Sequence, residues 1–257
     1  MTKVIRLLLV FITTIGTVQM LFAQDMVTIK EGSYIPLYGN DSIPKVVQTF
    51  KMDVNPVTYR EFQKFLLNNP AWLKENVKGL FADNAYLIRW KGGATYNEGI
   101  NPDSPITYVS WFAAKKYCEC QNKRLPTTDE WEYVSMASED KMDARKEEDY
   151  NAKILSWYET ANTELDVVRS NPKNYWGVYD LHGLVWEWTL DFNSVLISGE
   201  SRKDIDNDPN LFCGAAAVGA TDLMNYAAFM RYAFRGSINA KYSMKNLGFR
   251  CAKDIAN

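Results

Sequence analysis

The chain of 257 residues has a single histidine, His182, and lacks the HExxH, CxxC and GxxxxGK[ST] motifs. These absences exclude a zincin-type metal site, a thioredoxin-like redox pair and a phosphate-binding P-loop. A lone histidine in a turn favours a structural role. Cys118 and Cys120 form only a CxC sequence, which does not by itself indicate a metal site.

A strong charge of one sign is also missing. The chain has 29 lysine and arginine residues against 31 aspartate and glutamate residues, which gives a formal net charge of −2. This balance excludes a polybasic membrane surface and gives no indication of a nucleic-acid partner.

Long apolar runs are confined to residues 1–23, which read as a secretory signal peptide. Lys3 and Arg6 supply the positive start, an apolar stretch follows, and Ala23 is a plausible cleavage point. Polar residues interrupt the apolar stretch and argue against a permanent membrane span, although an uncleaved anchor is the alternative. The mature chain is therefore expected to be exported, periplasmic or secreted, and soluble without an integral membrane segment.

Residues 24–257 are expected to form one domain, because about 234 residues can enclose a full core. The composition is 47% apolar and 14% aromatic, as for a globular protein with a packed, irregular core. The four cysteines are Cys118, Cys120, Cys213 and Cys251. An even number in an exported chain indicates disulfides, and the count allows three connectivities.

The sequence GVYDLHGLVWEW at residues 177–188 is dense in aromatic side chains and places Glu187 between two tryptophans. Alternation along a strand would put Val185 and Glu187 on one face and Trp186 and Trp188 on the other. A carboxylate in this setting is either a bonded core acid or a ligand group.

Elsewhere, residues 26–57 alternate like the short strands of a β-meander. Thr58 and Ser110 are expected to cap helices near 58–67 and 111–121, and Thr127 with Glu130 has the spacing of a capping box. The mixed charges of residues 138–153 are typical of a solvated face.

Residues 177–189 resemble the "GLYDMxGNVWEWT" block of the formylglycine-generating, sulfatase-modifying-factor family. Three more blocks occur in the family's order: VSWFAA at 109–114, KRLPTTDEWEY at 123–133 and NLGFR at 246–250. The resemblance implies an irregular, C-type-lectin-like α+β fold, with two core helices around a twisted antiparallel sheet. It also implies a disulfide between Cys118 and Cys251, and leaves Cys120 and Cys213 either paired or with Cys213 as a free thiol.

The oxidase members of that family bind copper(I) through two cysteines five residues apart. Counting back from Asn246 aligns Arg231 and Arg235 with family arginines and places the two cysteine positions on Asp222 and Ala227. Alanine has no donor atom, and aspartate is a hard ligand that suits copper(I) poorly. The copper-dependent oxidation of cysteine to formylglycine is therefore not expected of this chain.

Two further metals occur in relatives. One branch holds nonheme iron with histidines from an added domain, and a chain with one histidine does not fit it. Some members hold calcium, which needs six to eight oxygens. Leu184 replaces the asparagine of the family's "GNVWEW", and Asn162, Glu164 and Asp166 could supply only a few ligands. Copper and calcium stay open as cofactors, and neither is predicted.

The leading interpretation is a scaffold that keeps a peptide-binding groove without the oxidase chemistry. Such a protein would be an accessory or maturation factor for an exported partner, and residues 212–235 are similar to those of accessory proteins of copper nitrite reductases. The predicted groove residues are Trp186, Glu187, Asn225, Arg231 and Arg235.

Two alternatives remain. One is a lectin-like module for glycan or protein, with the acidic cluster Asp204, Asp206, Asn207 and Asp208 as its calcium-dependent site. The other is an oxidoreductase with a non-standard copper site, for which Cys213 and Asp222 are the catalytic candidates and Met224, Met230 and Met244 the additional soft ligands.

Overall fold

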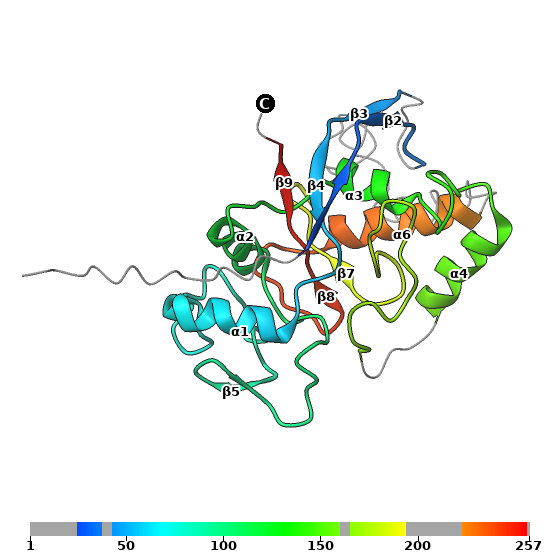
Figure 1. Cartoon of the computed structure of the whole chain (residues 1–257). Helices are drawn as coiled ribbons and strands as arrows, with labels where there is room; N and C mark the ends of the chain where they lie inside the picture. The colour runs from blue at the N-terminus through cyan, green and yellow to red at the C-terminus, as the bar shows by residue number, and fades with distance from the viewer. Residues whose placement is uncertain (1–24, 38–42, 160–164, 194–222, 256–257) are drawn as a thin grey trace, which may run out of the picture.

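The computed structural model describes residues 25–37, 43–159, 165–193 and 223–255 (Figure 1). Short strands and helices alternate with long irregular connections, which makes the fold α+β. The strands are β1 (Met26–Ile29), β2 (Gly32–Tyr34), β3 (Lys45–Val47), β4 (Phe50–Asp53), β5 (Trp90–Gly92), β6 (Thr95–Tyr96), β7 (Trp186–Glu187), β8 (Leu247–Gly248) and β9 (Ala252–Asp254). The helices are α1 (Tyr59–Asn68), the 3-10 turn η1 (Pro70–Trp72), α2 (Trp111–Cys120), α3 (Thr128–Ser135), α4 (Glu148–Glu159) and α6 (Leu223–Ser237).

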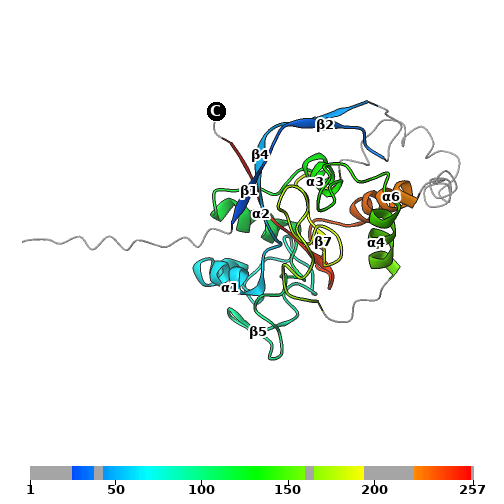
Figure 2. The same ribbon diagram turned by 45° about the vertical axis from the view of Figure 1, so that its right-hand side comes forward.

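A three-stranded antiparallel sheet brings together segments from both ends of the sequence. Strand β4 lies between β1 and β9 (Figure 1). Met52 of β4 is fully buried and lies opposite Val27 of β1 and Ala252 of β9. Phe50 and Met52 point inward while Lys51 is exposed, which is the period of a strand with one buried face. The expected short strands in residues 26–57 are confirmed, and β2 and β3 extend from this sheet as a hairpin (Figure 2).

Three helices begin where the sequence predicts their caps. The Thr58 hydroxyl accepts a hydrogen bond from the Glu61 backbone N–H, and the Glu61 carboxylate accepts one from the Thr58 backbone N–H. Thr127 and Glu130 form the same capping box at α3, and Ser110 caps α2. Each cap satisfies backbone donors that the first helical turn leaves without a partner.

The main core lies between α1, α2 and the segment that contains β8. Phe62 of α1 is 5.9 Å from Tyr117 of α2, and Tyr117 is 5.3 Å from Phe249, measured between ring centroids. These rings are almost completely buried. Helices α1 and α2 are thus the two core helices predicted near 58–67 and 111–121.

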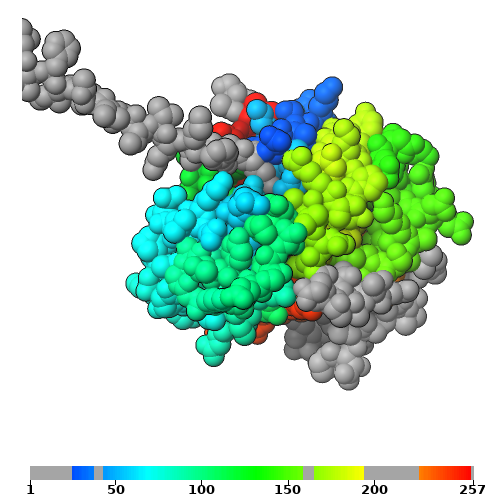
Figure 3. All heavy atoms as spheres, turned by 60° about the horizontal axis from the view of Figure 1, so that its bottom comes forward, coloured from blue at the N-terminus to red at the C-terminus, as the bar shows by residue number. Residues whose placement is uncertain are grey.

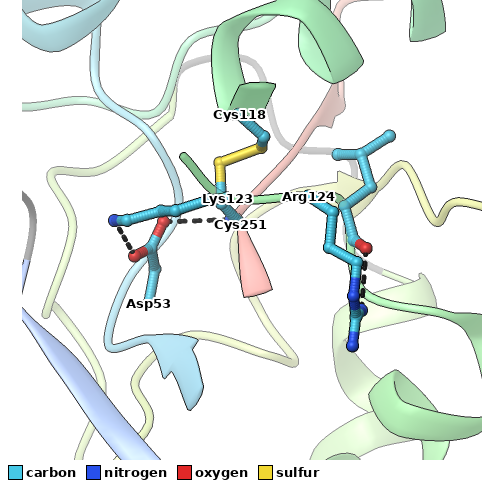
Figure 4. The surroundings of a disulfide bond; sticks show 6 residues. Asp53, Cys118, Lys123, Arg124 and Cys251 are labelled. Carbon is cyan, nitrogen blue, oxygen red and sulfur yellow. Dashed lines mark hydrogen bonds and ion pairs between the residues drawn. A yellow bond between two sulfur atoms is a disulfide. The ribbon is translucent and has the colours of Figure 1, made fainter. Parts of the chain in front are cut away.

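A disulfide ties α2 to the residue before β9. Cys118 and Cys251 are 133 residues apart in sequence, and their Cα atoms are 5.6 Å apart. Beside them, the buried Asp53 carboxylate contacts Lys123 Nζ at 2.5 Å and accepts a hydrogen bond from the Cys251 backbone N–H at 3.0 Å (Figure 4). Burial raises the pKa of Asp53 to about 6, although the Lys123 ammonium opposes this change. This disulfide is the one that the family resemblance implies.

Two features differ from the sequence-based expectation. The strands do not all join one antiparallel sheet, because β2–β3, β5–β6 and β7–β8 are separate pairs and β7–β8 is parallel. Helices α4 and α6, which pack against each other (Figure 2), were not predicted either. The buried face of α6 includes Arg231 and Arg235 beside Ala228 and Tyr232. Because two charged residues lie on that face, the sequence lacks the helical spacing of apolar residues by which such a helix is predicted.

No helix within the described ranges is both long and apolar enough to cross a membrane. The predicted signal peptide, residues 1–23, lies outside those ranges.

Candidate functional site

Glu187 forms a fully buried ion pair with Arg250. The Arg250 Nη2 and Nε atoms donate to the carboxylate at 2.8 and 3.0 Å, and neither side chain has any exposed surface. Trp131 Nε1 donates to the same carboxylate at 2.8 Å. The guanidinium also reaches the Tyr179 carbonyl oxygen at 2.9 Å. Glu187 is therefore a bonded core acid that fixes β7 against the segments carrying Tyr179 and Arg250.

A second buried cluster joins α3 to α6. The Glu132 carboxylate accepts hydrogen bonds from Arg231 Nη2 and Arg235 Nη1, each at 2.7 Å, and from Arg231 Nε at 2.9 Å. The Arg235 guanidinium also lies over the Trp131 ring, 4.7 Å from its centroid. Burial alone would raise the pKa of Glu132, but the two guanidiniums lower it to about 2.

These contacts correct the predicted groove. Glu187, Arg231 and Arg235 are each less than 5% exposed, and their charged groups bind other groups of the same chain instead of lining an open surface. Trp186 is half-buried and stacks between Phe234, at a centroid distance of 4.6 Å, and Tyr158, at 5.2 Å. Asn225 lies on α6, and its side chain is outside the described part of the structure.

Ala227 is the residue on which the count back from Asn246 places one of the two copper-ligand positions of the oxidases. It is fully buried on α6 and packs against Ile154 of α4. Its methyl group has no lone pair to give to a metal. The other position, Asp222, and the alternative ligand Cys213 lie outside the described residues. Cys118 and Cys251 are joined in the disulfide, and the Cys120 thiol on α2 contacts Asn69 Oδ1 at 3.7 Å. The residues present therefore do not fit the two-thiolate copper site.

The described ranges hold no group of three or more His, Cys, Asp and Glu residues able to bind a metal. The Asp180 carboxylate accepts hydrogen bonds from the backbone N–H groups of Arg169 and Asn171. Leu184 is buried. Asn162 and Glu164 lie outside the described residues, as does the acidic cluster at 204–208.

A cavity of about 770 Å³ lies between α4, the segment after α3 and the loop 171–183. Figure 3 shows the surfaces of these stretches side by side, in green and yellow-green. Tyr150, Trp157 and His182 contribute aromatic walls. The acidic residues that line it are Glu139, Asp140, Glu147, Asp149 and Asp180. Sequence reasoning missed this cavity because it read residues 138–153 as an ordinary solvated face.

His182 is held as a neutral imidazole at this cavity. Its Nε2 atom lies 3.1 Å from the Ser135 carbonyl oxygen, which can only accept, so Nε2 carries a proton. Burial and the nearby Arg231 charge lower the pKa of His182 to about 3. The structural role expected for this histidine agrees with that bond.

The comparison with known families matches residues 13–255 to the domain described as sulfatase-modifying factor enzyme 1-like. The chain belongs to that family. The formylglycine-generating enzyme of Bos taurus is 28% identical over 252 residues, which cover 81% of this chain and 66% of that enzyme. The formylglycine-generating enzyme of Streptomyces coelicolor is 30% identical over 204 residues, covering 72% of this chain and 61% of the other.

Another family relative is described as inactive. The inactive C-alpha-formylglycine-generating enzyme 2 of Bos taurus is 27% identical over 244 residues, covering 80% of this chain and 77% of that protein. Among solved structures, PvdO from Pseudomonas aeruginosa matches with a TM-score of 0.52 and 18% identity, covering 90% of this chain and 95% of the other. CarF matches with a TM-score of 0.50 and 16% identity, covering 91% and 99%. These structural likenesses establish the fold.

Proposed function

We propose that this chain is an exported, non-oxidase member of the family that binds a protein partner outside the cytoplasm, as an accessory or maturation factor. The observation that carries the proposal is Ala227. Its methyl group is buried and packs against Ile154, and the ungapped count back from Asn246 aligns this position with the second copper thiolate of an oxidase. The proposal keeps the family's scaffold and assigns it to binding.

The buried polar clusters support a scaffold that is intact without the copper pair. Glu187 pairs with Arg250, and Glu132 pairs with Arg231 and Arg235, so that these ion pairs hold β7 in place and join α3 to α6. Buried charges that lack partners would destabilise the fold. The bovine relative named as an inactive C-alpha-formylglycine-generating enzyme agrees with a family in which the scaffold also occurs without the oxidase activity.

Export is supported by two independent features. Residues 1–23 have the composition of a secretory signal peptide. The disulfide between Cys118 and Cys251 suits an oxidising compartment, since such bonds are rare where thiols are kept reduced. The partner would then be another exported protein, with a copper redox enzyme as the specific case that the sequence favours.

Formylglycine formation on a cysteine-containing sulfatase peptide tests the loss of oxidase activity. The protein, purified after export, would be incubated with the peptide, copper(I) and oxygen, and the peptide analysed by mass spectrometry. The Streptomyces coelicolor enzyme serves as the active reference. We expect conversion with the reference and none with this chain. Conversion by this chain would overturn the proposal.

Metal content and the number of free thiols would be measured on the same preparation and, in parallel, on the Cys213→Ser variant. Stoichiometric copper that disappears in Cys213→Ser would favour the copper oxidoreductase and contradict the accessory role. Capture of one exported protein in cross-linking from the native host, with Cys118 and Cys251 oxidised, is the supporting result.

A further inference from the structure

The cavity beside α4 carries many hydrogen-bond acceptors, although serine, asparagine and lysine side chains among its lining residues can also donate. Because Nε2 of His182 donates to the Ser135 carbonyl and the ring is neutral, its Nδ1 atom is a bare acceptor. That Nδ1 atom is buried and has no hydrogen-bond partner among the described residues. His182 therefore brings neither a positive charge nor a second hydrogen-bond donor to this wall.

The charge of the lining agrees with this. Five carboxylate residues line the cavity, and Lys153 is the one cationic side chain among its lining residues. Lys153 Nζ lies 4.0 Å from Glu139 Oε1, and Lys141 pairs with Glu147. Asp149, at the first turn of α4, is exposed and makes no ion pair among the described residues. The surplus of negative charge is local, because the chain as a whole carries only −2.

The apolar part of the lining suits long basic side chains. Trp157 is half-buried and, with Tyr150 and His182, offers ring surface beside the carboxylates. The alkyl stems of lysine and arginine pack on such surfaces, and their charged heads bind ring faces and carboxylates. An anionic ligand would be repelled by these carboxylates, and a purely apolar ligand would leave Asp149 without a cationic partner.

We propose that this cavity binds the lysine and arginine side chains of an extended basic segment in a protein partner. This inference rests on the proposed binding function and names the chemistry of the partner. The volume of about 770 Å³ exceeds what one such side chain fills, and the acids lie on three separate segments, at 139–140, at 147–149 and at Asp180. Several cationic side chains on one peptide match that spread better than a single free amine.

A fluorescently labelled peptide of alternating arginine and glycine tests the inference by fluorescence anisotropy against the intact protein. A peptide with glutamate in place of arginine is the charge control, and free arginine amide competes in a third arm. The test variant is Glu139→Gln with Asp149→Asn. The matched control is Glu75→Gln with Glu98→Gln, which makes the same charge change at exposed positions near β5.

We expect binding of the arginine peptide alone, and about fivefold weaker binding for each cavity carboxylate removed. The control variant should bind like the parent protein. Equal affinity in the cavity variant and the parent would overturn the inference, as would preference for the glutamate peptide. Competition by arginine amide at the peptide's own affinity would assign the cavity to a free amine and overturn the peptide assignment.

The two proposals fail separately. If an exported partner is captured equally well by the parent and the cavity variant, the binding function stands and the cavity assignment falls. If the arginine peptide binds but the chain also forms formylglycine, the cavity assignment stands and the non-oxidase function falls.

Discussion

Glu132→Gln should be the most damaging single polar substitution between α3 and α6. Its carboxylate is the ion-pair partner of both Arg231 and Arg235, which are each 3% exposed, so glutamine would leave two buried guanidiniums facing a neutral amide. Removing one partner of a buried ion pair costs about 3–5 kcal/mol. The lowered pKa leads to a similar value, because a shift from 4.5 to about 2 corresponds to roughly 3 kcal/mol.

The measurement is urea unfolding at pH 7, followed by tryptophan fluorescence. Glu119→Gln is the control, because Glu119 pairs with Lys115 on the exposed face of α2 and should cost about 0.5 kcal/mol or less. A loss for Glu132→Gln no larger than that of the control would refute the reasoning.

The pH dependence gives a second check on Glu132. Because its pKa is lowered in the folded state, its contribution is fully present above about pH 4.5 and is lost as the pH falls toward 2. Glu132→Gln should therefore reduce the loss of stability over that acidic range. An unchanged acid profile would contradict the assignment.

Three further changes test other parts of the structure. Reducing the Cys118–Cys251 disulfide, or replacing both cysteines by serine, should lower the free energy of unfolding by about 4–5 kcal/mol in the chain-entropy account; an unchanged urea midpoint would contradict it. Gly248→Ala should cost about 1–3 kcal/mol, because a Cβ there would lie 2.7 Å from the Ile106 carbonyl oxygen, and an unaltered melting temperature would exclude that clash. The pKa of His182 is lowered in the folded state, so its contribution to the free energy of unfolding is present above pH 6.5 and is lost as the pH falls toward 3. Between pH 7 and pH 6 we expect the free energy of unfolding to fall by about 0.7 kcal/mol, and His182→Phe should abolish this change.

Local rules sufficed for the parts of the fold whose causes lie close together in sequence. Thr58 and Glu61, or Thr127 and Glu130, are three residues apart, so the capping boxes could be read directly. The α+β class and the pairing of Cys118 with Cys251 came from the family resemblance. No local rule could have selected that pairing among the three possible ones.

The candidate site depended on contacts that no local pattern contains. Arg231 and Glu132 are 99 residues apart, and Glu187 and Arg250 are 63 apart. Because the sequence does not show these partners, it predicts Arg231 and Arg235 as groove residues and gives α6 no clear apolar face. The cavity likewise forms only where α4 packs beside the loop 171–183, and a local sequence pattern does not show that these segments come together. Cys213 and Asp222 lie outside the described residues, so their proposed catalytic role stays a prediction.

The position of Arg250 has a consequence for when the chain can fold during its synthesis. Its guanidinium contacts Glu187 and the carbonyl oxygens of Asp53, Val54 and Tyr179, and β9 completes the sheet begun by β1 and β4. The central core therefore cannot assemble until residues 247–254 have been synthesised, and most of its contacts join distant parts of the sequence. A chain threaded through a membrane during synthesis would still be unfolded at that moment. If the chain is exported as proposed, this late closure would leave the polypeptide unfolded during translocation, and the Cys118–Cys251 bond would form afterwards in the oxidising compartment.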